Sequence, residues 1–393
     1  MEESWWLTMI GFLLGLMFLF SGFLVNALQV LSVLLFLPFS RKAYRLANIM
    51  LMESLWSELV WLLDWWAGVK VRLYTDAETW KLMGNEHALL ICNHSSDIDW
   101  LVGWLLAQRV GCLGSTRAVM KMSTKFLPVV GWSMWLSEYV FLARNWAIDE
   151  TTLKRGFERL KSFPRPMWVA LFVEGTRFTK AKLAAAQEYA VSVGMQIPKH
   201  VLIPRTKAKI PGFVSAVQNL RGFVPVVYDM TVAISKEAPN PTILRILKCQ
   251  SSVVHVHVRR VPMKQLPTTD IEIAAWCREA FHKKDMMLDQ HVKANTFGEH
   301  LYQPDPRPIR PLVVVVGWGI VLLTGAVWLL RTLLCTRSGI ALVAGVLVLL
   351  LFLVQVLVLS SQSERSTDPA ASKPKPIHST QRPAPDPDHI KLH

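Results

Sequence analysis

A histidine and two aspartates lie close together in the segment NHSSDIDW, residues 93–100. His94 and Asp99 are five positions apart, and on a continuous helix this step turns the two side chains about 140° away from each other. They can meet only if the chain bends between them, with His94 just past a strand and Asp99 in the first turn of a helix capped by Ser95 or Ser96. In that geometry the carboxylate orients the imidazole, whose free nitrogen can act as a general base.

The spacing alone makes Asp97 as good a partner for His94 as Asp99. Asp97 could instead serve the N-terminus of the following helix, where negative charge is stabilising. A histidine beside an aspartate is also common as a purely structural hydrogen bond. If His94 is a base, no serine nucleophile is needed, because the activated hydroxyl would belong to the substrate.

A second polar segment is FVEGTRF, residues 172–178, which follows the apolar run Trp168–Val173. The apolar run Ala88–Cys92 precedes NHSSDIDW in the same way. Such runs are typical of buried strands that lead into functional loops. Because open α/β sheets place their sites at strand ends, we expect both segments to contribute to one site.

The second segment contains groups that suit phosphate binding. Gly175 lets the backbone turn close to a ligand, and the guanidinium of Arg177 can bind phosphate in a bidentate manner. Arg144, in VFLARNW, offers a second cation. The structural alternative is an ion pair between Glu174 and Arg177 that only ties the loop. With His94, these residues predict chemistry on a phosphorylated compound that carries a hydroxyl group.

The composition indicates a globular domain attached to a membrane. Of the 393 residues, 52% are hydrophobic and 16 are Trp, yet 18% are charged. The net charge of +14 favours anionic headgroups and polyanionic substrates, although a solvated basic surface without a ligand explains it equally well. The 5 cysteines show no CxxC pair and no zinc-type spacing, which argues against disulfides and a metal and favours a reducing compartment.

Several stretches have the composition of membrane helices. Residues 5–39 carry no charge, and the stretch is long for one membrane span but short for two. Either a first helix to about Val25 spans the membrane and a second lies in the interface, or the two helices form a shallow hairpin. Leu312–Leu330 and Ile340–Leu359 predict a transmembrane hairpin, with flanking basic residues that favour a cytoplasmic domain. Residues 46–66 predict a helix whose four tryptophans either lie in the headgroup layer or pack against the core: Trp56, Trp61, Trp65 and Trp66.

Between these segments, short apolar strands alternate with helical patterns, which predicts one α/β domain. The expected strands are Ala88–Cys92, Trp168–Val173, Phe223–Tyr228 and Val253–Val258. The predicted organisation is therefore N-terminal membrane helices at 1–45, an interfacial helix at 46–69, an α/β domain at 70–305, a C-terminal transmembrane hairpin at 306–360 and a disordered tail at 361–393.

The ordered motifs NHSSDIDW, FLARNW, FVEGTRF and FVPVVYD resemble those of the glycerolipid acyltransferases, and most closely those of the plant endoplasmic-reticulum lysophosphatidic acid acyltransferases. The resemblance extends over nearly the whole chain and includes DWWAGVK, FLPVVGWSMW, AAQEYA, VLIPRTK and the SSQSERST tail. It implies an α/β acyltransferase domain on an N-terminal membrane two-helix motif, followed here by the C-terminal transmembrane hairpin.

The resemblance also assigns roles, position by position. It makes His94 the catalytic base and Asp99, rather than Asp97, its partner. The histidine would deprotonate the sn-2 hydroxyl of lysophosphatidic acid, which attacks the acyl-CoA thioester and gives phosphatidic acid. Acyl-CoA is a co-substrate, with no metal and no bound cofactor implied. The implied substrate-binding residues are Arg144, Glu174, Gly175, Thr176, Arg177 and Pro225.

Three features depart from the family pattern. Ser96 replaces a usual arginine and Ala143 replaces a usual acid, so we expect altered phosphate affinity or acyl selectivity. Ala208–Pro211 is an insertion, which we expect to alter the phosphate-facing loop and the level of activity. Residues 93–95 also form an N-glycosylation acceptor, and a glycan there would block the base. The expected catalytic domain therefore faces the cytosol, and the resemblance implies that the multi-pass chain is located in the endoplasmic reticulum membrane.

Other functions find less support in the chain. A GxSxG elbow and glycine-rich phosphate loops are missing from the sequence, which argues against a serine lipase and a lipid kinase. The expected partners are the bilayer and the two substrates, without nucleic acid. Two alternatives stay open: a lysophospholipid acyltransferase or transacylase for another headgroup, and a catalytically silent membrane scaffold. His255 and His257 have no third ligand, so we expect surface residues and no metal site.

Overall fold

The computed structural model describes residues 5–204, 210–298, 301–302 and 307–362. Two expectations from the sequence fall at least partly outside these ranges. One is the insertion, of which positions 208 and 209 are not described. The other is the tail, which is not described from residue 363 onward.

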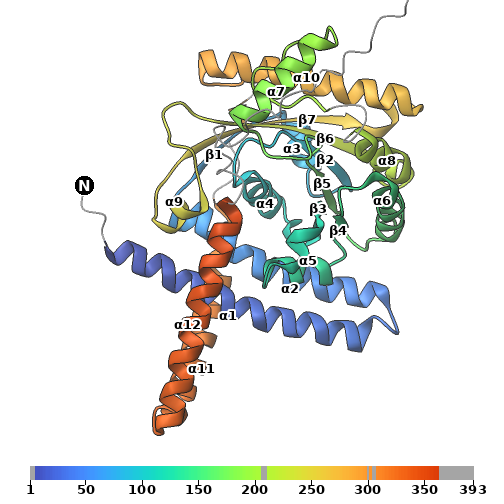
Figure 1. Cartoon of the computed structure of the whole chain (residues 1–393). Coiled ribbons are helices and arrows are strands. Elements are labelled where there is room, and N and C mark those ends of the chain that lie inside the picture. Colours follow the sequence, from blue (N-terminus) through green and yellow to red (C-terminus); the bar gives the residue numbers. More distant parts are fainter. Residues whose placement is uncertain (1–4, 205–209, 299–300, 303–306, 363–393) are drawn as a thin grey trace, which may run out of the picture.

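A mixed sheet forms the centre of the described chain (Figure 1). Its eight strands have the order β4-β3-β5-β2-β6-β7-β1-β8, and the five strands from β4 to β6 run parallel to their neighbours. β7 is antiparallel to β6 but parallel to β1, and β8 is antiparallel to β1. The α/β prediction is confirmed. The strands are β1 Lys70–Tyr74, β2 Ala88–Cys92, β3 Thr116–Lys121, β4 Val140–Leu142, β5 Trp168–Leu171, β6 Val226–Ile234, β7 Val253–Pro262 and β8 Leu301–Tyr302.

The strands expected from apolar runs are all present, although their ends differ. β2 has the predicted bounds, whereas β5 ends at Leu171 because the chain turns at Phe172, whose carbonyl accepts a hydrogen bond from Gly175 N–H. β6 starts later than expected and continues to Ile234. Its residues are buried almost throughout, as is usual for a central strand covered on both faces.

Helices cover both faces of the sheet. Along β2, Leu90 packs in a core with α4 and α2, whereas Leu89 and Ile91 pack in a second core with α6, α8 and α10. This alternation follows from the two-residue period of a strand. The helices of the domain are α3 Ala77–Leu82, α4 Asp99–Arg109, α5 Val130–Leu136, α6 Trp146–Leu160, α7 Lys180–Ser192, α8 Ile210–Leu220, α9 Ile243–Leu247 and α10 Asp270–Ala294.

The N-terminal apolar stretch forms one continuous helix, α1 (Trp5–Phe36), which packs beside α2 (Arg41–Trp61). The expectation of two helices before residue 45, with a break near Val25, is wrong. Asn26 and Gln29 do not interrupt the helix, because their side chains face the domain. Asn26 donates a hydrogen bond to Ser133 Oγ at 2.6 Å, and Gln29 donates one to Ser137 Oγ at 3.0 Å.

The tryptophan-rich helix is α2, which a π-helical turn extends through residues 62–66. Trp56 is fully buried and stacks on Trp104 of α4, with ring centroids 4.1 Å apart. Core packing therefore accounts for this tryptophan. A position in the lipid headgroup layer stays a prediction for the exposed parts of the helix.

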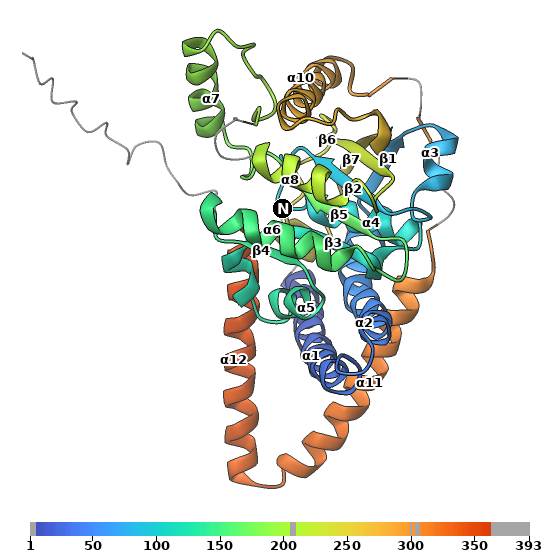
Figure 2. The ribbon, with the colours of Figure 1, turned by 90° about the vertical axis from the view of Figure 1, so that its right-hand side faces the viewer.

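Two long helices follow the domain, α11 (Arg310–Leu333) and α12 (Arg337–Gln362). They extend away from the domain across the direction of α1 (Figure 1), and they diverge from their short connection (Figure 2). In the described ranges, four helices are long and apolar enough to cross a membrane: Met9–Phe36, Arg41–Trp66, Arg310–Leu333 and Arg337–Val356.

Candidate active site

The two polar segments meet because β2 and β5 are parallel neighbours in the sheet, with Ala88 paired to Trp168. Their carboxyl ends therefore lie at the same edge. The loop after β5 is tied to the loop after β2 by a hydrogen bond from Phe178 N–H to the His94 carbonyl at 2.7 Å. The sequence expectation that both segments build one site agrees with this arrangement.

His94 and Asp99 are in contact, with 3.0 Å between Nδ1 of the ring and Oδ2 of the carboxylate. The Asp99 side chain is 1% exposed, and its Oδ2 also accepts the Ser96 N–H at 2.8 Å. The imidazole packs against Phe172 and is 23% exposed. Because an ionised carboxylate can only accept a hydrogen bond, Nδ1 carries the proton and Nε2 is left as the basic nitrogen.

The start of α4 differs from the expected serine cap. The helix begins at Asp99 with Ile98 at the N-cap and without a side-chain hydrogen bond to the cap. Ser96 Oγ accepts the Ile98 N–H at 3.4 Å and donates to the Pro241 carbonyl at 3.3 Å. The bend is instead closed by the Asp99 carboxylate, which reaches back to the backbone of Ser96.

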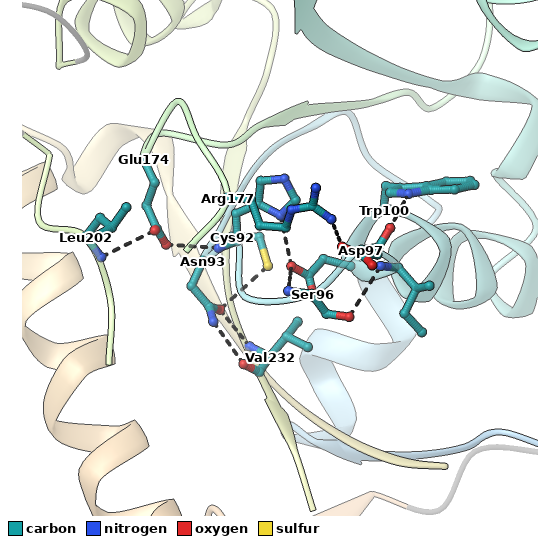
Figure 3. A network of polar contacts seen from close by, with 12 residues as sticks. Cys92, Asn93, Ser96, Asp97, Trp100, Glu174, Arg177, Leu202 and Val232 are labelled. Atoms are coloured by element: carbon teal, nitrogen blue, oxygen red, sulfur yellow. Dashed lines mark hydrogen bonds and ion pairs between the residues drawn. The ribbon is translucent and has the colours of Figure 1, made fainter. Parts of the chain in front are cut away.

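Asp97 has a different partner from Asp99. Its carboxylate forms an ion pair with the Arg177 guanidinium, and its carbonyl accepts the indole N–H of Trp100 at 2.8 Å (Figure 3). The two aspartates therefore hold two different functional groups. Among the described residues, the alternative of an ion pair between Glu174 and Arg177 is not found, because Arg177 reaches Asp97 instead.

Glu174 stabilises the candidate site through buried hydrogen bonds to backbone N–H groups. Its side chain accepts the N–H of His94 at 2.9 Å and the N–H of Leu202 at 3.3 Å, and the residue is 1% exposed (Figure 3). It does not line the cavity that His94 and Arg177 line. The direct substrate contact expected of Glu174 is therefore not supported by the structure, since the carboxylate is turned toward buried backbone donors.

The turn after Glu174 depends on glycine. Gly175 has φ 61°, a left-handed conformation that side chains with a Cβ rarely adopt. Thr176 Oγ1 accepts a hydrogen bond from Lys182 Nζ at 2.6 Å, and the same ammonium group donates to the Arg177 carbonyl at 3.1 Å. Sequence reasoning missed Lys182. A lysine in the first turn of α7, where positive charge is disfavoured, was the available signal.

Arg144 reaches the same loop from the end of β4. Its Nη2 donates to the Gly175 carbonyl at 3.3 Å, and its backbone has φ 66°. Non-glycine residues in this region are uncommon and are found at functional sites more often than elsewhere. The following residue, Asn145, caps α6 and fixes the chain direction. Arg144 and Arg177 are thus both available at the cavity.

The cavity has a volume of about 1350 Å³ and combines polar and apolar walls. His94, Asp97, Arg144 and Arg177 provide polar groups. The apolar walls come from membrane-candidate helices as well as from the domain, and they include Phe18 of α1, Leu62, Trp104 of α4, Ile246 of α9 and Val354 of α12. Such a cavity suits an amphipathic ligand with an anionic group and a long apolar chain.

The chain matches two family models, Acyltransferase over residues 69–232 and Acyltransferase C-terminus over residues 245–318. A 1-acyl-sn-glycerol-3-phosphate acyltransferase 2 from Brassica oleracea is 57% identical and covers 93% of each chain. Its counterpart from Arabidopsis thaliana is 56% identical over 93% of this chain and 94% of its own. The chain belongs to the glycerolipid acyltransferase family. This confirms the resemblance inferred from the ordered motifs.

A crystal structure of a 1-acyl-sn-glycerophosphate acyltransferase from Thermotoga maritima also aligns with this acyltransferase. It is 16% identical, covers 71% of this chain and 97% of its own, and has a TM-score of 0.39. The family assignment therefore rests on the sequence relatives.

One expected substrate-binding residue of this acyltransferase lies far from the cavity. Pro225 directly precedes β6, and the register pairs Val226 with Ala88, the first residue of β2. Pro225 is therefore at the opposite edge of the sheet from His94, at least roughly 15 Å away along a five-residue strand. Its carbonyl accepts the Met263 N–H at 2.7 Å. The expectation of substrate contact is wrong, because the motif marks the beginning of its strand and not its end.

The two residues before His94 are Asn93, whose side chain has a structural role, and Cys92, whose thiol is unreactive. The Asn93 amide exchanges hydrogen bonds with the Val232 backbone at 2.9 and 2.8 Å and is 1% exposed, so the folded acyltransferase cannot be glycosylated there. Desolvation raises the pKa of the Cys92 thiol well above its ordinary value. A cysteine thiolate is therefore not the nucleophile at this strand end.

The histidines of β7 also differ from the expectation. His255 is fully buried rather than on the surface, and its Nδ1 lies 2.8 Å from Nε2 of His291 on α10. α10 covers this face of the sheet, which a strand pattern alone cannot reveal. Within the described residues, no group of three or more His, Cys, Asp or Glu side chains is placed to bind a metal ion.

Proposed function

We propose that this acyltransferase transfers an acyl chain from acyl-CoA to the sn-2 hydroxyl of lysophosphatidic acid, which gives phosphatidic acid. The observation that carries the proposal is one cavity that presents a paired histidine, two arginines and extensive apolar walls. The names of the relatives indicate the same acceptor. Acyl-CoA acts as co-substrate, and the reaction needs no bound cofactor.

In the proposed reaction, His94 Nε2 takes the proton of the acceptor hydroxyl as its oxygen attacks the thioester carbonyl. A carbon–oxygen bond forms, the carbon–sulfur bond breaks, and the imidazolium returns the proton to the leaving CoA sulfur. Asp99 stabilises the imidazolium because it lies 3.0 Å from Nδ1. General acid–base catalysis of this kind typically contributes about 10²- to 10⁴-fold in rate.

Arg177 and Arg144 bind the phosphate of the acceptor in this proposal. Arg177 is held toward the cavity by Asp97, and Lys182 fixes the loop that carries it. Phosphate offers guanidinium several charge-assisted hydrogen bonds and competes well with one carboxylate. Ser96 is 7% exposed and does not line the cavity, so we do not expect its side chain to contact the phosphate.

The apolar helices support a reaction at a membrane. We infer that α11 and α12 form a transmembrane hairpin and that α1 and α2 form the N-terminal membrane motif, with the domain on the cytosolic face of the endoplasmic reticulum. The length and composition of the helices support this placement. The free cysteines of the chain suit a reducing compartment, and acyl-CoA is available on that side.

The test is a headgroup comparison with purified full-length protein in detergent. Labelled acyl-CoA is offered with lysophosphatidic acid, lysophosphatidylcholine or lysophosphatidylethanolamine, and kcat/KM is measured for each. We expect lysophosphatidic acid to be preferred by at least about tenfold, which corresponds to one charge-assisted hydrogen bond of about 1.4 kcal/mol. Preference for another headgroup would support the alternative acyltransferase, and no transfer to any acceptor would support the silent scaffold.

A further inference from the structure

An exposed aromatic surface lies beside the cavity, on the segment from Lys121 to Leu136, which we call the lip. It comprises the end of β3, a 3₁₀ turn over Met122–Phe126 and helix α5. Phe126 is 70% exposed, and Trp132 and Trp135 are 39% and 54% exposed. Large aromatic side chains that share one exposed surface indicate an interaction site, and tryptophan is enriched at the level of lipid headgroups.

The charge of the lip matches an anionic lipid surface. Lys121 is exposed, and Lys125 Nζ lies 4.3 Å from the centroid of the Trp135 ring. Residues 121–136 contain no Asp or Glu. Lysines beside interfacial tryptophans can place their ammonium groups among lipid phosphates while the apolar parts stay in contact with the acyl region.

The opposite face of the lip is anchored to α1, so the aromatic face has a fixed orientation. Val129 is fully buried with φ 62°, which is unusual for a β-branched residue. Its side chain fills the notch at Gly22 of α1, where an added Cβ would lie 2.2 Å from Val129 Cγ1. Asn26 of α1 also donates to Ser133 Oγ of α5 at 2.6 Å.

The aromatic face continues the apolar surface of α1. The ring of Trp132 contacts the ring of Phe23 with centroids 6.0 Å apart, and Figure 2 shows α5 directly beside α1. The outward side chains Phe20 and Leu24 of α1 are 40% and 45% exposed. The lip and the membrane-candidate helix α1 therefore present one surface, and a bilayer is the partner that covers both.

The inner side of the same segment lines the cavity. Lys121, Thr124, Leu127 and Met134 contribute to its wall, as does Phe18 of α1. We propose that the lip inserts into the headgroup layer of a bilayer that contains anionic phospholipid and that an acidic lysophospholipid passes along it from the bilayer to His94. The passage of substrate rests on the proposed function, whereas the insertion of the lip does not.

Insertion is tested by fluorescence, without any catalytic readout. Cys249→Ser and Cys335→Ser remove the exposed cysteines of the described chain, and Phe126→Cys then supplies a site for an environment-sensitive dye. The control is Ile271→Cys on α10, a position 81% exposed on the opposite face of the sheet. Full-length proteins are placed in nanodiscs of phosphatidylcholine and phosphatidic acid that contain a spin-labelled lipid. We expect at least about twofold stronger quenching at position 126, and equal quenching would overturn the insertion.

Substrate passage is tested by kinetics on Phe126→Ser/Trp135→Ser, with Ile271→Ser as the matched control. The double variant should raise the KM for bilayer-presented lysophosphatidic acid at least about threefold and leave the KM for a short-chain, water-soluble analogue unchanged. An unchanged bilayer KM, or an equal rise for both acceptors, would overturn the passage. If the wild type transfers no acyl chain, the proposed function fails while the quenching result still decides the insertion.

Discussion

The aspartates of NHSSDIDW show how two identical side chains, two positions apart, come to hold different groups. Asp99 starts α4 and turns back toward His94, while Asp97 lies before the helix and faces Arg177. His94 is also held through its backbone by Glu174. The proposed base and the proposed phosphate-binding cation are thus each oriented by a carboxylate, and the loops that carry them are joined.

Substitution of Arg177 should weaken binding of the acceptor more than it slows the chemical step. Arg177→Ala removes charge-assisted hydrogen bonds worth about 1.5–3 kcal/mol, so the KM for lysophosphatidic acid should rise about 10- to 100-fold with a smaller change in kcat. Steady-state kinetics at varied acceptor concentration measure this. Arg259→Ala is the control, because Arg259 also pairs with an aspartate but lies outside the cavity. An unchanged KM in Arg177→Ala would move the phosphate site elsewhere.

At this scale, the spacing predicted that His94 meets one of two aspartates at a bend, and the family resemblance, not the spacing, selected Asp99. The role of Asp97 was not predictable, since it depends on Arg177, which arrives from the loop after another strand. The role expected of Pro225 was wrong because a linear motif does not show at which edge of the sheet it lies. The spacing of residues within one loop restricts which of them can be in contact, whereas contacts between residues of different loops depend on the order of the strands in the sheet.

The helix α1 is an element with two different faces. Its outward side chains are apolar, while Ser21, Asn26, Gln29 and Ser32 are buried against the domain. Ser21 donates to Glu58 Oε2 at 2.9 Å, and the others contact α2 and α5. The prediction of a break at Asn26 assumed that polar residues interrupt a membrane helix. Their position on one face of a 3.6-residue helix was the signal for a continuous helix packed on the domain.

The contact between α1 and the lip should be sensitive to one methyl group. Gly22→Ala places a Cβ against Val129, and overpacking of this kind costs about 1–3 kcal/mol. We expect the apparent melting temperature in detergent to fall by at least about 3 °C. Differential scanning fluorimetry measures it.

The control for this substitution is Gly317→Ala in α11, where an added Cβ meets nothing within 4 Å. Alanine there should leave stability unchanged or raise it slightly, because alanine has the higher helix propensity. Equal melting temperatures for the wild type and both variants would show that the notch at Gly22 does not hold the lip.

In the whole molecule, a central sheet carries the candidate site at one edge, and helices long and apolar enough to cross a membrane line the same cavity. The α/β domain and the apolar helices were predictable from composition and periodicity. The sheet order was not, because β1 pairs with β7, which lies more than a hundred residues later, in the register Lys70 with Val253. The helix α10, which comes later in the chain, also covers His255, which the sequence had indicated as a surface residue.

The buried histidine pair should make the fold sensitive to acid. Desolvation, together with the proximity of His291 and Arg72, lowers the pKa of His255 to about 4, and desolvation also lowers the pKa of His291. The unfolded chain binds a proton near pH 6.5, so it holds more protons than the folded chain between about pH 4 and 6.5. The free energy of unfolding should therefore fall as the pH is lowered from 7 to 5.

The check is the melting temperature across this pH range for the wild type and His255→Asn. The variant removes one titrating group and should show a shallower fall on acidification. His282→Asn, on the same helix as His291 but outside the pair, should keep the wild-type slope. A slope unaffected by His255→Asn would contradict a contribution of the pair to acid sensitivity.

The central claim is that His94 removes the proton of the acceptor hydroxyl. The direct measurement is kcat for acyl transfer to lysophosphatidic acid by purified His94→Ala, at saturating acceptor and acyl-CoA, with a wild-type melting profile as proof of folding. If His94 is the general base, kcat should fall about 10²- to 10⁴-fold. A folded His94→Ala variant that keeps more than about a tenth of the wild-type kcat would contradict this role.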